Sequence, residues 1–206
     1  VNKAMTNNDE LHNIRHSLAH LLASSVLELF PEAKLGVGPV IETGFYYDFE
    51  LPRSLTPEDI KQLEKRMKHL VKQSLAFERQ ELSTMDAKKF FEERNQPFKV
   101  ELISDIEKFG TTKLNQELGI KNDDSSEKTG TVSLYKTGEF IDLCRGGHVK
   151  NTKEIPEGSF TLDKVSGAYW RGDEKNPQMQ RVYGLAFENK EALEAYLYQF
   201  EEAKKR

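Results

Sequence analysis

Two pairs of chemically reactive side chains, each pair spaced four residues apart, constrain the fold of this chain most strongly. His16 and His20 form the first pair, and Cys144 and His148 form the second. Cys144 is the only cysteine in the chain. If the four side chains belong to one polar site, the fold has to bring an N-terminal segment beside a segment from the second half of the chain.

Each pair lies in a segment with its own periodicity. Apolar residues recur at helical spacing over residues 14–29, which predicts a helix with His16 and His20 one turn apart on the same side. Residues 139–144 alternate as a strand does, and Gly146 and Gly147 then allow a sharp turn close to a ligand. We therefore expect a helix and a strand-to-turn segment to present the four side chains.

The residue types leave three chemistries open. One cysteine and three histidines suit a tetrahedral zinc ion. A Cys-His nucleophile pair is a second interpretation, and a metal-free site that activates water is a third. The zincin protease pattern is absent, because Ser17 occupies the position of its catalytic glutamate. A lone buried histidine or cysteine is, moreover, often only structural.

Composition predicts a soluble, cytoplasmic protein with a proper core. The chain has 206 residues, of which 37% are apolar and 31% charged. It has no apolar run long enough to span a membrane, no signal peptide, and a single thiol that fits a reducing compartment. Because the first residue is Val1, we expect a piece excised from a longer polypeptide or a stand-alone form.

The net charge of −4 excludes a global positive field for nucleic acid, so any RNA has to be held locally. Arg171 and Arg181 are candidates within an aromatic segment. The other basic groups fit solvated helix faces better. They are Lys61, Lys65, Arg66, Lys68 and Lys72 on one helix and Lys204, Lys205 and Arg206 at the end of the chain.

Helices and strands do not alternate as βαβ units, so we predict an α+β fold with largely antiparallel sheets packed with helices. Further helices are expected at residues 57–76, 84–94 and 190–206, the last with an apolar stripe of Leu193, Tyr196, Leu197 and Phe200. Residues 104–130 are expected to form a short helix and a mobile loop. Strands are expected twice within 34–50 and at 77–82, 98–102, 131–135, 140–144, 159–166, 168–171 and 179–187.

Six motifs together resemble the N-terminal editing domain of bacterial threonyl-tRNA synthetase, a member of the threonyl/alanyl second additional domain superfamily. They are RHSLAHLL at 15–22, VGPVIETGFYYD at 37–48, LEKRM at 63–67, DLCRGGH at 142–148, SGAYWRGD at 166–173 and QRVYG at 180–184. The resemblance covers residues 11–206. It implies a flexible tail at 1–10, an editing domain at 11–188, and a C-terminal helix at 189–206 that leads toward an absent synthetic core.

The implied activity is hydrolysis of the ester in Ser-tRNA for threonine, which keeps translation accurate. The implied catalytic residues are His16, His20, Lys99, Asp142, Cys144 and His148. The implied residues around the seryl group and the terminal adenosine are Tyr46, Tyr47, Tyr169, Arg171, Arg181 and Tyr183. Pattern alone places Lys99 on the solvent face of the strand at 98–102, so its role rests on the resemblance. This chain also has Gly147 where many relatives have proline.

The resemblance implies that editing requires no cofactor, with His16 and Lys99 holding the attacking water. Zinc remains possible on His16, His20, Cys144 and His148, as in the related alanyl branch, whereas ATP and a second zinc would belong to the synthetic core. The implied partner is the 3′ end of tRNA for threonine carrying serine, and the full-length parent is expected to be a homodimer. A zinc-dependent trans-editing deacylase and a non-catalytic tRNA-binding module remain the alternatives.

Overall fold

The computed structural model describes residues 6–110 and 130–206, which form the α+β fold with antiparallel sheets that the sequence predicts. The larger sheet contains β1 (Lys34–Leu35), β2 (Val40–Ile41), β3 (Gly44–Glu50), β7 (Phe160–Tyr169) and β8 (Gln178–Ala186). The smaller sheet contains β4 (Glu78–Ser83), β5 (Thr131–Thr137) and β6 (Phe140–Leu143). The helices are α1 (Asn7–Leu29), α2 (Pro57–Lys72), α3 (Thr84–Glu93), α4 (Pro97–Phe109) and α6 (Lys190–Lys204), with short 3₁₀ helices η1 (Thr152–Glu154) and η2 (Trp170–Gly172).

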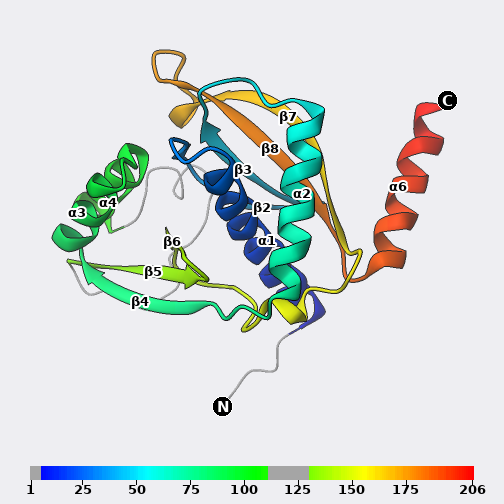
Figure 1. Ribbon diagram of the computed structural model, residues 1–206, viewed down its shortest axis with the longest axis horizontal. Helices are drawn as coiled ribbons and strands as arrows, with labels where there is room; N and C mark the ends of the chain where they lie inside the picture. Colours follow the sequence, from blue (N-terminus) through cyan, green and yellow to red (C-terminus); the bar gives the residue numbers. More distant parts are fainter. Residues whose placement is uncertain (1–5, 111–129) are drawn as a thin grey trace.

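Helix α1 is the centre of the molecule. It packs against β3 and α2, and the small sheet with α3 and α4 lies to one side of it (Figure 1). Leu18, Leu22 and Val26 of α1 are fully buried in the main core, together with Phe45 of β3. This central position carries His16 and His20 into the interior between the two sheets.

The helix starts follow local capping chemistry. Thr56 and Asp59 form a capping box at α2, with Pro57 in the first turn, so the helix starts at residue 57 as predicted, although it ends at Lys72 and not at residue 76. Thr6 and Asp9 form the same arrangement at α1. Helix α1 therefore begins at Asn7, and the prediction of a tail over residues 1–10 is wrong for residues 7–10, which form its first turn.

The predicted strand at 98–102 is wrong, because these residues belong to α4. Alternation of Phe98, Val100 and Leu102 suggested a strand, but Phe98, Leu102 and Ile103 are the buried apolar residues, which is helical spacing. Pro97 opens the helix and Gly110, in the left-handed conformation, ends it. The short apolar run satisfied both periods, and tertiary packing decided between them.

Smaller differences concern strand boundaries. Residues 160–169 form one continuous strand, β7, and residues 170–172 form η2, in which Arg171 has a positive φ of 56°. The segment 34–50 contains three strands where two were expected. The predicted start of a helix after residue 104 is the second half of α4. The mobile loop predicted before residue 130 lies mostly outside the described residues.

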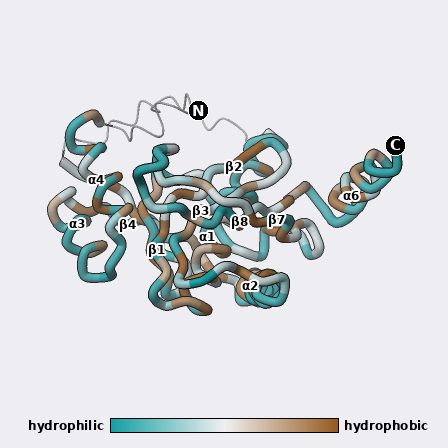
Figure 2. The backbone as a smooth tube through the Cα atoms, turned by 90° about the horizontal axis from the view of Figure 1, so that it is seen from above, coloured by the Kyte–Doolittle hydropathy of each residue, from teal (hydrophilic) through white to brown (hydrophobic). Residues whose placement is uncertain are grey.

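Helix α6 extends away from the rest of the molecule (Figure 2). Of its predicted stripe only Leu193 is buried, whereas Leu197 and Phe200 are 37% and 49% exposed. Within the described ranges, no helix has the length and apolar character that a membrane crossing requires.

Candidate functional site

The two reactive pairs meet in the structure. Nε2 of His16 lies 3.2 Å from Sγ of Cys144, and Nε2 of His148 lies 3.5 Å from the same sulfur atom. The rings of His16 and His148 stack with centroids 4.3 Å apart, and His20 lies 4.5 Å from His148. Helix α1 and the turn after β6 thus bring all four side chains into one cluster, as the sequence predicts.

Aromatic and polar contacts hold His148 in place. Its ring stacks on Phe77 at 5.0 Å and lies 4.4 Å from the ring of Tyr135. The next residue, Val149, donates its backbone N–H to Oγ of Ser17, which is fully buried on α1. This hydrogen bond joins the residue after His148 to the residue after His16, so it aligns the two segments of the cluster.

A buried polar network lies directly behind the cluster. Asp142 of β6 accepts hydrogen bonds from Nζ of Lys99 at 2.8 Å and from the hydroxyl of Tyr47 at 2.7 Å, and it faces Nδ1 of His20 at 3.5 Å. Lys99 also donates to the carbonyl of Gly36 and to the hydroxyl of Tyr47, both at 2.8 Å. Because an ammonium group has three N–H donors, all of the donors of Lys99 are used.

Lys99 is only 2% exposed, so its assignment to a solvent face is wrong. It lies in the first turn of α4, and that turn is attached to β1 by Gln96. The buried amide of Gln96 accepts from the backbone N–H of Leu35 at 2.8 Å and donates to the carbonyl of Ala33 at 3.0 Å. The helix start is thereby fixed beside Gly36, which is the carbonyl partner of Lys99.

Burial keeps the cluster uncharged at neutral pH. It lowers the pKa of His16 to about 4 and lowers the pKa of both His20 and His148, with the neighbouring histidines adding to the effect. Burial also raises the pKa of the Cys144 thiol to about 12. The cluster therefore presents neutral imidazoles, which can act as bases, and a protonated thiol, which can donate a hydrogen bond.

The hydrogen bonds orient the imidazoles. Nδ1 of His16 lies 3.2 Å from the carbonyl of Gly147, which can only accept, so Nδ1 carries the proton and Nε2 offers its lone pair to the cluster. Gly146 and Gly147 have φ of 119° and 88°, so the turn that supplies this carbonyl requires glycine. Nδ1 of His148 is buried and has no hydrogen-bond partner among the described residues.

The four side chains also fit a zinc ion. One donor atom from each of His16, His20, Cys144 and His148 lies within 4.8 Å of every other. Ligand atoms around a tetrahedral zinc ion are separated by about 3.3–3.8 Å. The 3.5 Å between Nε2 of His148 and Sγ of Cys144 lies within this range, and the 3.2 Å between Nε2 of His16 and the same sulfur lies just below it. The carboxylate of Asp142 lies 3.5 Å from Nδ1 of His20, in the position of the outer carboxylate that zinc-binding histidines often have.

The residues predicted around the adenosine separate into three places. Tyr47 is buried within the network of Asp142 and Lys99. Tyr46, Arg181 and Tyr183 lie on the opposite face of β3 and β8, where Arg181 pairs with Asp48 and covers the ring of Tyr46 at 4.1 Å. The structure does not bring these three residues to the cluster.

Tyr169 and Arg171 occupy a third place, at the end of β7. Tyr169 is 44% exposed. Arg171 pairs with Glu101 and Asp105 of α4, and Glu101 also accepts from the indole of Trp170. Arg171 is thus attached to the helix that carries Lys99.

Sequence reasoning missed Gln96, Ser17, Phe77 and Tyr135, and it did not predict the contact of Tyr47 with Lys99. Nothing in the local pattern distinguishes Gln96 from a surface glutamine. A stronger signal existed for Tyr47, since it alternates with Phe45 and Phe49 on the buried face of one strand.

Both a protein-family model and curated proteins resemble this chain. Residues 132–183 match the family model of the threonyl and alanyl tRNA synthetase second additional domain. The matched segment runs from β5 to β8 and includes Asp142, Cys144 and His148.

The whole chain is similar to bacterial threonine–tRNA ligases, which confirms the resemblance seen in the sequence. It is 50% identical over 197 residues to the ligase of Dehalococcoides mccartyi (strain CBDB1), which is 96% of the chain and 30% of the ligase. It is 48% identical over 198 residues to that of Citrifermentans bemidjiense and 46% to that of Gloeobacter violaceus, again over 96% of the chain and 28% of each ligase. The chain thus spans less than a third of the length of these relatives.

Proposed function

We propose that this chain is an editing hydrolase that cleaves the ester between serine and the tRNA for threonine. The observation that carries the proposal is the neutral His16, whose Nε2 lone pair lies 3.2 Å from Sγ of Cys144, in a chain similar to threonine–tRNA ligases. Such a lone pair can accept a proton from water at neutral pH.

The chemical similarity of serine and threonine explains why such an activity is needed. Serine lacks only the methyl group of threonine, and a missing methyl group limits discrimination in a binding pocket to about 10–200-fold. A ligase for threonine therefore requires a second site that removes serine. That site has to accept the smaller side chain and exclude threonine by collision with the extra methyl group.

In the proposed reaction, water attacks the ester carbonyl and transfers a proton to Nε2 of His16. That proton then passes to the ribose oxygen as the ester bond breaks, which releases serine and tRNA. His148 and the turn at Gly146 and Gly147 border the same space and orient the ester. Cys144, as a protonated thiol, forms part of the pocket wall and does not act as the nucleophile.

The network supports a positioning role for Lys99 and not direct contact with the water. Its three donors are already used by Gly36, Tyr47 and Asp142. Lys99 and Tyr47 thereby fix the carboxylate of Asp142, which faces Nδ1 of His20. We propose that this contact keeps the Nε2 lone pair of His20 directed at the cluster.

A zinc-dependent version of the same hydrolysis is the second candidate, and the four clustered donors favour it. Bound zinc would act as a Lewis acid toward the ester or the water. His16, His20, Cys144 and His148 would hold it, and Cys144 would have to lose its proton. We favour the metal-free version, because Asp142 and Lys99 already provide a fixed electrostatic environment without an ion.

The test follows ester loss from Ser-tRNA for threonine with the purified chain. We expect hydrolysis that a chelator does not change and that His16→Ala slows by about 10²–10⁴-fold. The matched control is His69→Ala, an exposed histidine of α2 away from the cluster, which should keep the wild-type rate. Hydrolysis lost to chelation and restored by zinc would favour the second candidate, and binding without any ester loss would refute both.

A further inference from the structure

The turn between β7 and β8 contains an unusual backbone conformation. Arg171 has a φ of 56°, in the left-handed region that residues other than glycine rarely adopt. Among the described residues, Ser74 and Asn95 share this property, and each follows the last turn of a helix, where a left-handed residue is common. Arg171 instead lies between two strands, so its strain has to be offset by the contacts that its conformation allows.

That conformation directs the side chain of Arg171 at helix α4. Nε of Arg171 lies 3.3 Å from Oε2 of Glu101, and its terminal nitrogen Nη1 lies 2.9 Å from Oδ2 of Asp105. These two carboxylates are one helical turn apart, so a single cation joins two successive turns of α4. A guanidinium group suits this contact because its N–H donors point outward in a fixed plane.

Trp170 contacts the same helix from the same turn. Its indole N–H donates to Oε2 of Glu101 at 2.7 Å, and this oxygen is the one that also faces Arg171. Trp170 is 4% exposed, and its ring lies 4.8 Å from that of Phe98 in a small apolar cluster that includes Leu102. Trp170 and Arg171 thus hold both polar and apolar side chains of the first two turns of α4.

Hydrogen bonds within the turn keep Trp170 in place. Its backbone N–H donates to the carbonyl of Pro177 at 3.0 Å, and its carbonyl accepts from the side-chain amide of Asn176 at 2.9 Å. Residues 170–177 therefore form a closed turn between β7 and β8, which are the two longest strands of the larger sheet. Trp170 and Arg171 are thus attached to a rigid part of the fold.

Lys99 belongs to the same stretch of α4. It lies between Phe98 and Glu101 in the sequence, and its ammonium group pairs with Asp142 at 2.8 Å. Two turns of a hydrogen-bonded helix move together, so a rotation that shifts Glu101 also shifts Nζ of Lys99. Contacts that fix Glu101 therefore also fix the distance between Lys99 and Asp142.

The same contacts limit what else Arg171 can bind. The sequence resemblance implies a place for this residue near the terminal adenosine. Two carboxylates already compensate its charge, however, and a phosphate group would have to displace both of them. The structure therefore favours a role of Arg171 toward α4 over a role toward RNA.

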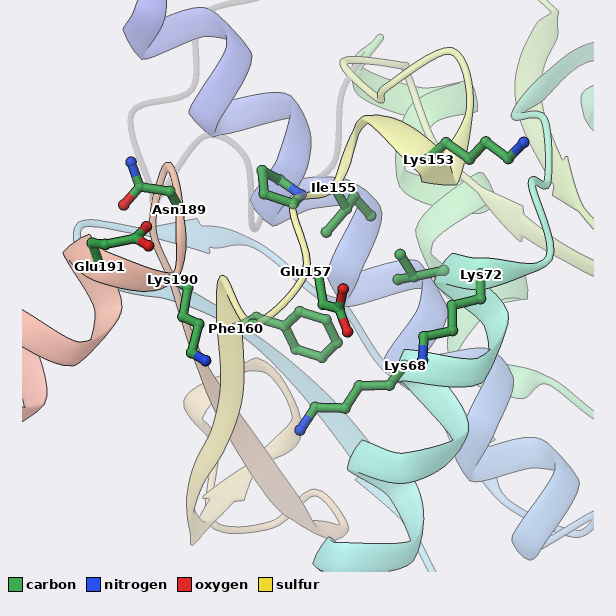
Figure 3. Close-up of a pocket in the computed structure, with 12 residues that line it drawn as sticks. Lys68, Lys72, Lys153, Ile155, Glu157, Phe160, Asn189, Lys190 and Glu191 are labelled. Atoms are coloured by element: carbon green, nitrogen blue, oxygen red, sulfur yellow. The ribbon is translucent and has the colours of Figure 1, made fainter.

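The surface groove between α2 and α6 lies apart from this contact (Figure 3). Its described lining comes from the end of α2, residues 153–160 and residues 189–191. A substitution at residue 171 does not alter this lining. An effect of such a substitution on the reaction would therefore not come from the groove.

We propose that Trp170 and Arg171 are positioning residues of the proposed hydrolysis. They hold α4 so that Lys99 stays paired with Asp142. This inference rests on the proposed function, because ester hydrolysis is the activity that the position of α4 affects. Arg171 acts through the carboxylates of α4 and not through contact with RNA, so its loss lowers the rate of the bound complex and leaves the affinity for RNA unchanged.

The test measures single-turnover hydrolysis of Ser-tRNA for threonine over a range of enzyme concentrations. Arg171→Gln should lower the maximal rate by about 10–100-fold, because a displacement of about 1 Å can cost two orders of magnitude in rate. The enzyme concentration at half-maximal rate should not change. Arg171→Lys, which keeps the charge, should recover part of the rate. A higher half-maximal concentration with an unchanged maximal rate would overturn the inference, because it would identify Arg171 as an RNA ligand.

A double-mutant cycle separates action through α4 from direct action. Glu101→Gln/Asp105→Asn removes both partner charges, and adding Arg171→Gln to it should lower the maximal rate no further, since the same contact is already lost. Additive losses would contradict the inference. The matched control is Arg53→Gln, which breaks the ion pair between a half-exposed arginine and Asp59 of α2 and should keep the wild-type rate.

Amide hydrogen exchange of α4 gives a readout that does not depend on hydrolysis. Arg171→Gln should speed exchange at residues 101–105 by about tenfold, whereas Arg53→Gln should not. Trp170 is the only tryptophan of the chain, so its fluorescence emission should shift to longer wavelength in the same variant. Unchanged exchange in Arg171→Gln would overturn the inference. Faster exchange in this variant, together with Ser-tRNA that even the wild type leaves intact, would support the hold on α4 and refute the proposed function.

Discussion

Asp142 is the residue on which the buried network depends. It receives hydrogen bonds from Lys99 and Tyr47 and faces His20, and it is 2% exposed. A buried carboxylate beside a buried ammonium group is stable only as a pair, because either charge alone would be left without solvation.

We therefore expect Asp142→Asn to lower the free energy of unfolding by about 3–5 kcal/mol, because it leaves Lys99 unpaired. Adding Lys99→Met should recover part of that loss, since the double variant buries no charge. Urea unfolding of the wild type, the two single variants and the double variant measures this coupling. Asp163→Asn, at an exposed position of β7, is the control and should change stability by less than about 0.5 kcal/mol. Additive losses in the double variant would contradict the pairing.

At this scale the sequence indicates the four members of the cluster but not the residues that hold them in place. The spacing of His16, His20, Cys144 and His148 indicates two matched pairs, and the structure brings them together. Lys99 could be assigned only through the family resemblance, because its burial depends on a helix that the local pattern does not specify. The contacts of Gln96 are long-range in sequence, so no periodicity reports them.

Helix α4 is the element that places the network. Its first turn carries Lys99, and Gln96 attaches that turn to β1 through two buried hydrogen bonds. Arg171 and Trp170 bind the exposed side of the same helix through Glu101. The helix is thus held at both its start and its outer face.

We predict that Gln96→Leu loosens this start and costs about 1–3 kcal/mol, since the N–H of Leu35 and the carbonyl of Ala33 lose their partners. Deacylation should fall even under conditions where the variant remains fully folded, because Lys99 loses its register with Asp142. Parallel measurements of urea unfolding and ester hydrolysis test this. Gln62→Leu on the exposed face of α2 is the matched control. A lower free energy of unfolding without any change in ester hydrolysis would show that Gln96 matters for folding alone.

The start of α2 was predicted correctly, because a threonine followed by Pro57 is a strong local signal, whereas its end lies four residues before the predicted one. The failure at residues 98–102 came from a short apolar run that fits both a strand and a helix. Such a run is decided by what it packs against, and here Phe98 packs on Trp170 while Ile103 packs in the small core beside Phe91.

For the whole molecule, the buried histidines link stability to pH. The pKa values of His16, His20 and His148 are lowered in the folded state, that of His16 to about 4. The unfolded chain therefore binds more protons below about pH 6.5, so stability is full above that pH and falls as the pH decreases toward 4.

We expect the urea midpoint to be constant from pH 8 to 7 and to fall steadily below pH 6.5. His20→Asn should flatten this dependence, because one of the three titrating groups is removed. His69→Asn, on the exposed side of α2, should leave the slope unchanged. A midpoint that rises on acidification would contradict the lowered pKa values.

The site needs most of the length of the chain, because its residues come from segments that are far apart in the sequence. Helix α1 supplies His16, the small sheet supplies Cys144, and α4 supplies Lys99, so the site exists only when both sheets pack around α1 (Figure 1). The α+β class followed from the order of elements, whereas the convergence of these three segments could not be derived from spacing.

The central claim is tested most directly by comparing two esters of the same tRNA. Ser-tRNA and Thr-tRNA, both made with the tRNA for threonine, are incubated with the purified chain in single-turnover conditions, and loss of each ester is followed. We predict rapid loss of the seryl ester and little loss of the threonyl ester, because the additional methyl group is excluded from the site. Equal hydrolysis of both esters, or hydrolysis of neither, would contradict the account.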